Sequence, residues 1–145
     1  MIKTNLVDGT GTGNRARVTA FGQVITGPVS YNSVATQDMD VATQVYNFVI
    51  PQAGHRIVID GLLLYANRNV GVNDATVTIY ESTGGPDSAV VSQTILNTEM
   101  AKQTRADIIG INFLCSEGSW INASTDDDDV FLTVLYYYVP ITDFT

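Results

Sequence analysis

The sequence predicts an all-β protein, an antiparallel β-sandwich of the jelly-roll type with about eight strands. From residue 43 onward, short runs rich in Val, Ile, Thr and Tyr alternate with clusters of Gly, Pro, Asn and Asp. Such runs are typical of strands and such clusters of turns. Only residues 96–104 could form a helical turn, so there are no crossover helices and the strands should pair antiparallel. The jelly roll is the commonest closed arrangement of eight such strands.

Eight segments carry the strand pattern. Each is rich in β-branched or aromatic residues, and the joints carry turn-forming sequences such as Pro51-Gln52-Ala53-Gly54 and Gly84-Gly85-Pro86-Asp87. The predicted strands are residues 31–35, 43–50, 56–66, 75–81, 90–96, 107–114, 119–123 and 130–139.

Residues 1–30 differ from the rest and predict an extended N-terminal arm before a single sandwich domain, residues 31–145. The stretch from residue 8 to 14 alternates glycine with small polar residues, so it lacks side chains that can anchor a core. Glycine also costs the most entropy to order, which is typical of an arm or linker. Residues 17–21 and 23–26 alternate like two short strands, a pattern that would let the arm add itself to a sheet edge.

The strand predicted at residues 130–139 is apolar on both faces, with Thr133 the only polar residue. Because a sandwich strand normally buries one face and exposes the other, the second face requires a cover. The cover is either another subunit or loops of the same chain. One face holds Val130, Leu132, Val134, Tyr136 and Tyr138. The candidate subunit interface on the other face is Phe131, Leu135, Tyr137 and Val139.

Residues 56–65 show the same property less strongly, with Asp60 as the only interior charge. Strict alternation predicts two apolar faces here as well. It places Ile57, Ile59, Leu63 and Tyr65 on one face and Val58, Leu62 and Leu64 on the other.

Composition restricts the function classes. The 145 residues carry a net charge of −8 with only seven Lys and Arg, so no basic stripe is available to neutralise nucleic-acid phosphates. The single cysteine, Cys115, excludes an intramolecular disulfide and is expected to be buried. Residues 1–10 lack the layout of a signal peptide and no apolar run is long enough to span a bilayer, so we expect a soluble protein made in a cytoplasm.

No constellation predicts an enzyme. The only histidine, His55, follows a turn, and the sequence holds no Gly-x-Ser-x-Gly elbow that a serine triad would use. One His and one Cys cannot supply a closed zinc site on their own. The run Asp126, Asp127, Asp128 and Asp129 offers hard oxygens to calcium, but it lacks the spacing of a calcium-binding loop. A solvated hairpin turn is the favoured interpretation, and we expect no cofactor.

Four segments carry a resemblance to a known group of proteins. They are residues 7–14 (VDGTGTGN), 61–73 (GLLLYANRNVGVN), 116–118 (SEG) and 123–128 (ASTDDD). With its strand layout, the chain resembles the small jelly-roll proteins from virions of tailed bacteriophages, of the capsid cement, decoration or head-fibre base type.

The resemblance implies a non-enzymatic homotrimer on the capsid exterior, bound to the major capsid protein of the shell with its N-terminal arm laid on that protein. The acidic body and the glycine-rich arm agree with this. The implied docking residues are Asp8, Gly9, Arg15, Arg17, Val18, Phe21, Val24 and Ile25. The alternative is a carbohydrate- or receptor-binding sandwich of a phage fibre, which would need an exposed aromatic platform; a hydrolase is a more distant alternative.

Overall fold

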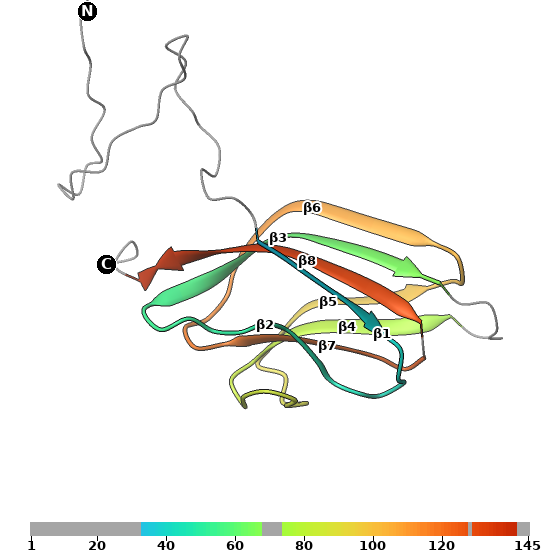
Figure 1. The fold of residues 1–145 in the computed structure, drawn as a ribbon, viewed down its shortest axis with the longest axis horizontal. Helices are drawn as coiled ribbons and strands as arrows, with labels where there is room; N and C mark the ends of the chain where they lie inside the picture. The colour runs from blue at the N-terminus through green and yellow to red at the C-terminus, as the bar shows by residue number, and fades with distance from the viewer. Residues whose placement is uncertain (1–32, 68–73, 128, 142–145) are drawn as a thin grey trace, which may run out of the picture. The chain divides into compact units, whose positions relative to one another are not determined.

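The chain forms two four-stranded antiparallel sheets that pack face to face (Figure 1). The computed structural model describes residues 33–67, 74–127 and 129–141. The strands are β1 (Ser33–Met39), β2 (Tyr46–Val49), β3 (His55–Ala66), β4 (Ala75–Ser82), β5 (Gln93–Met100), β6 (Arg105–Leu114), β7 (Trp120–Thr125) and β8 (Val130–Pro140).

The strand order is that of a jelly roll. One sheet runs β1-β8-β3-β6 and the other β2-β7-β4-β5. Apart from the β4–β5 hairpin, every connection between consecutive strands crosses from one sheet to the other, which is how two interleaved Greek keys form. The fold class predicted from the sequence is therefore confirmed.

The core lies between the sheets and is made by the inward halves of the alternating strands. Val130, Leu132 and Val134 of β8 are fully buried there, as predicted. Tyr136 and Tyr138 continue the same face, and their rings contact each other edge to face with centroids 5.6 Å apart. The Tyr138 hydroxyl, at the rim, donates a hydrogen bond of 2.6 Å to the Ile50 carbonyl of the β2–β3 connection.

Strict alternation along β3 was a wrong prediction, because the strand contains a β-bulge. Ile59 lies opposite Tyr136 of β8, whereas Gly61 lies opposite Leu135, so β3 has one extra residue, Asp60, relative to β8. An extra residue exchanges the two faces of every residue that follows it. The inward residues are consequently Ile57, Ile59, Leu62, Leu64 and Ala66. The outward residues are Arg56, Val58, Gly61, Leu63 and Tyr65.

The helical turn considered for residues 96–104 is also wrong over its first half. Residues 96–100 complete β5, and Met100 is buried opposite Ala75 of β4. The chain then turns at Gln103, which has a φ of 56° and donates its N–H to the Ala66 carbonyl at 2.6 Å. Burial of the Met100 side chain explains why the strand extends this far.

Candidate functional site

The outer face of the β1-β8-β3-β6 sheet carries a cluster of apolar side chains. The same side of the sheet also presents polar and charged residues, namely Thr36, Asp38, Arg56, Arg105 and Asp107. In-register pairing places side chains from all four strands on this side, and we call the surface they form the apolar face. The predicted interface residues of β8 lie in the middle of it and are partly buried. The apolar face comprises Val34, Val58, Leu63, Tyr65, Ile109, Leu114, Phe131, Leu135, Tyr137 and Val139.

Three members of the apolar face project well into solvent. Ile109 is 69% exposed, Val34 61% and Tyr65 37%. Val34 and Ile109 belong to the two edge strands, so exposed apolar side chains occur on both sides of β8. Sequence reasoning missed these two residues. Ile109 falls within the strand predicted at residues 107–114, but only the strand order shows that it shares a surface with Leu135.

The side chains of β8 are fitted to the neighbouring strand β3. A Cβ on Gly61 would lie 3.1 Å from a methyl group of Leu135 and 3.2 Å from the Ile108 carbonyl oxygen, so Leu135 lies directly over the glycine. Next to it, the rings of Tyr65 and Phe131 stack with centroids 6.4 Å apart and planes 29° apart. This packing explains why the predicted interface residues are only partly exposed in a single subunit.

A shallow pocket of about 120 Å³ lies within the apolar face. The stacked Tyr65 and Phe131 and the neighbouring Leu63 provide apolar walls, while Arg105 and Thr133 contribute polar atoms. The Thr133 hydroxyl also shares a 2.9 Å hydrogen bond with the Thr36 hydroxyl. A pocket of this size and lining fits one apolar side chain of a protein partner better than a drug-sized ligand.

The outer face of the other sheet is polar. It presents Thr76 and Thr78 of β4, Ser124 of β7 and Asn97 of β5. Nearer the opposite end, the connection from residue 83 to 92 folds over this face. It is held there by paired hydrogen bonds between Asn47 and Asp87, of 2.6 and 2.9 Å, and by the Ser88 carbonyl, which accepts from Tyr80 and Asn122. The two outer faces of the sandwich therefore differ in chemistry.

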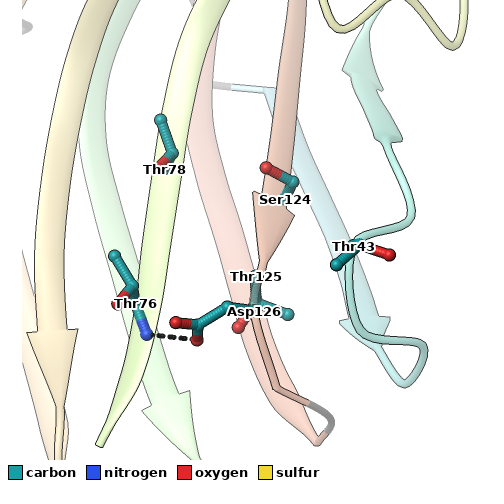
Figure 2. A pocket seen from close by; sticks show the side chains of 6 residues that line it. All are labelled: Thr43, Thr76, Thr78, Ser124, Thr125 and Asp126. Atoms are coloured by element: carbon teal, nitrogen blue, oxygen red, sulfur yellow. Dashed lines mark hydrogen bonds between the residues drawn. The ribbon is translucent and has the colours of Figure 1, made fainter.

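A second pocket, of about 300 Å³, opens where β4 and β7 meet the β1–β2 connection (Figure 2). Its lining is hydroxyls and one carboxylate, with no aromatic side chain. Asp126 accepts a hydrogen bond of 2.7 Å from the Thr76 N–H and returns one of 3.1 Å from its own N–H to the Thr76 carbonyl. The lining residues are Thr43, Thr76, Thr78, Ser124, Thr125 and Asp126.

The aspartate run forms the β7–β8 turn. Besides the contacts of Asp126, the Asp127 N–H donates to the Thr125 hydroxyl at 3.3 Å, and Asp129 has a φ of 57° while its carbonyl accepts from Asn67 at 2.9 Å. Asp128 lies outside the described residues. Among the residues that the structure describes, no three His, Cys, Asp or Glu side chains are grouped so that they could hold a metal ion. The predicted hairpin turn is therefore wrong: β7 and β8 lie in different sheets, and these contacts hold the connection that carries the chain from one sheet to the other.

A buried carboxylate links the two sheets. Glu81 lies near the end of β4 and is 1% exposed. It accepts hydrogen bonds from the N–H (2.5 Å) and the hydroxyl (3.4 Å) of Ser116, and Arg56 donates to the adjacent Cys115 carbonyl at 2.6 Å. Cys115 is fully buried, as expected. Burial is the main cause that raises the pKa of its thiol strongly, and the nearby Glu81 carboxylate adds to the effect. The group is structural, because it ties the β6–β7 connection to both sheets.

His55 begins β3, where its Nδ1 lies 3.0 Å from the Ala53 carbonyl and its ring contacts Tyr138 edge to face. The structure does not bring it together with the serine that a triad would need in any described contact. The predicted arm and its docking residues lie outside the described residues, so that prediction stays open.

Comparison with known proteins adds no relatives: no family model, curated protein or solved structure matches the chain. In the described part of the chain, no helix has the length and apolar character needed to cross a membrane.

Proposed function

We propose that the chain is a non-enzymatic virion structural protein: a decoration, or cement, protein that binds the outer surface of a phage head shell as a homotrimer and stabilises it. The observation that carries the proposal is the apolar face, where Val34, Tyr65 and Ile109 are exposed around the partly buried residues of β8, because clustered exposed apolar side chains often mark protein–protein contacts. The outer face of the β2-β7-β4-β5 sheet is polar, so the apolar cluster occurs on one side of the sandwich and not on the other.

Two further features support an assembly role over catalysis. The site chemistry described above is structural: Glu81 ties connections together, and Asp126 closes a turn. The resemblance in sequence to phage decoration proteins supplies the partner, the major capsid protein. A chain of net charge −8 suits a soluble component on the virion exterior.

The proposal is tested by native mass spectrometry together with co-sedimentation of the protein with empty shells. Leu135→Asp places a charge in the apolar face and should dissociate the trimer, since an unpaired charge cannot be buried at low cost. Ser124→Asp is the matched control, because it adds the same charge to the polar outer face. A wild-type protein that is monomeric at micromolar concentration and stays in the supernatant with shells would contradict the proposal.

A carbohydrate-binding fibre module is the second candidate, favoured by one observation, the hydroxyl-lined pocket of Figure 2. Hydroxyls and a carboxylate can hydrogen-bond sugar hydroxyls. The aromatic platform that the alternative requires is absent from the residues lining this pocket. Glycan-array binding that Thr78→Val abolishes would favour this candidate over the first.

A further inference from the structure

The apolar face must be covered by a surface that differs from itself if the assembly is a threefold ring. In a C3 ring each subunit uses two different patches, one facing each neighbour. The polar outer face of the β2-β7-β4-β5 sheet is a poor match for the apolar face. Outside the described residues, residues 17–26 offer a run of apolar side chains, namely Val18, Phe21, Val24 and Ile25.

We infer that residues 17–26 of a neighbouring copy lie on the apolar face, with the Phe21 side chain in the pocket that Tyr65 and Phe131 help to line. This inference rests on the proposed homotrimer, in which each subunit would bind residues 17–26 of the next subunit. Residues 1–16, with Asp8 and the glycine-rich stretch, then remain available for the shell.

The position at which the described chain begins supports this occupant. β1 starts at Ser33, opposite Tyr136, and Val34 already projects from the apolar face. The preceding segment is thus covalently attached at the margin of this surface. Extended residues span about 3.3–3.6 Å each, so residues 27–32 alone reach roughly 20 Å. A four-stranded sheet is only about 15 Å across, so the segment is long enough to leave one subunit and reach the face of the next.

Charge also favours this occupant. Residues 1–32 contain three of the seven basic residues and one of the fifteen acidic ones, which gives them a net charge of +2, while residues 33–145 carry −10. Attraction between a basic arm and an acidic body raises the rate of encounter without fixing the docked position. The position is fixed by apolar contact, for which the pocket beside Phe131 is the natural anchor point.

The test uses the full-length chain and two variants that differ in mass by a short tag. One carries Val24→Cys and the other Ile109→Cys, and the two are co-expressed and oxidised. The native Cys115 is fully buried and does not compete. We expect a disulfide between chains of different mass. A disulfide joining two Ile109→Cys chains would instead show that two apolar faces meet directly, and would overturn the inference.

A second measurement separates this inference from the proposed function. Phe21→Asp should dissociate the trimer in native mass spectrometry while the melting temperature of the subunit is retained, whereas Asn14→Asp, with the same charge change, should leave the trimer intact. A Phe21→Asp protein that remains as stable a trimer as the wild type overturns the docking of the arm and leaves the homotrimer standing. A monomeric wild type overturns both.

Discussion

Two leucines of β8, three residues apart, offer a direct test of which side of the strand is core and which is assembly surface. Leu132 is fully buried between the sheets, while Leu135 lies over Gly61 on the apolar face. Truncating a buried leucine to alanine costs about 2–5 kcal/mol because it removes apolar contacts and leaves a cavity. For a chain of this size each kcal/mol lowers the melting temperature by about 2–4 °C. Leu132→Ala should therefore lower it by roughly 10 °C.

Leu135→Ala should behave differently, because solvent on one side of the residue means that no closed cavity forms. We expect a loss of about 1 kcal/mol in the isolated subunit. The part of the Leu135 side chain that is exposed in the isolated subunit would be buried by a neighbour in the trimer. This burial contributes about 0.5–1 kcal/mol per copy to the free energy of association, hence about 2 kcal/mol over three copies. That corresponds to roughly 30-fold weaker trimer association.

Thermal denaturation at high dilution reports the first quantity, and native mass spectrometry over a concentration series reports the second. The reasoning would be refuted if Leu135→Ala lowered the melting temperature as much as Leu132→Ala and left the mass distribution unchanged. The outer side of β8 would then be sealed by its own chain.

Three further outcomes are expected. Glu81→Ala should lower the free energy of unfolding by about 1–3 kcal/mol, measured by urea denaturation, because the buried Ser116 N–H loses its acceptor, and Glu81→Gln, which retains an acceptor oxygen, should lose less. Burial raises the pKa of the Cys115 thiol and of the Tyr80 phenol in the folded protein. The free energy of unfolding should therefore be retained below the unfolded thiol pKa of about 8.5 and should fall as the pH rises above it. A native protein in which Cys115 reacts rapidly with a thiol reagent at pH 8 would contradict this. A calcium chelator should shift the melting temperature by less than about 1 °C, since Asp126 is already held by the Thr76 N–H, and a drop of several degrees would show that the turn binds an ion.

The sandwich and the inward face of β8 could be predicted from the sequence because they depend on local alternation. Val130, Leu132 and Val134 alternate with period two, and they point into the core as expected. The composition of the apolar face could not be predicted in this way, since Val34, Leu135 and Ile109 meet only through the order β1-β8-β3-β6. Likewise, Glu81 reads as a surface acid until the β6–β7 connection brings the Ser116 N–H to it.

The bulge at Asp60 explains why the faces of β3 were predicted correctly before this residue and wrongly after it. In an unbulged β3, Leu63 and Tyr65 would share a face with Ile57 and Ile59 and would point between the sheets. The extra residue turns them outward instead, next to Phe131 of β8. Bulges are a common device for re-aiming strand side chains, and they leave no periodic trace in the sequence. The bulge thus supplies the apolar face with the walls of its pocket, and the same irregularity that defeats the period-two prediction creates the surface on which the proposed assembly depends.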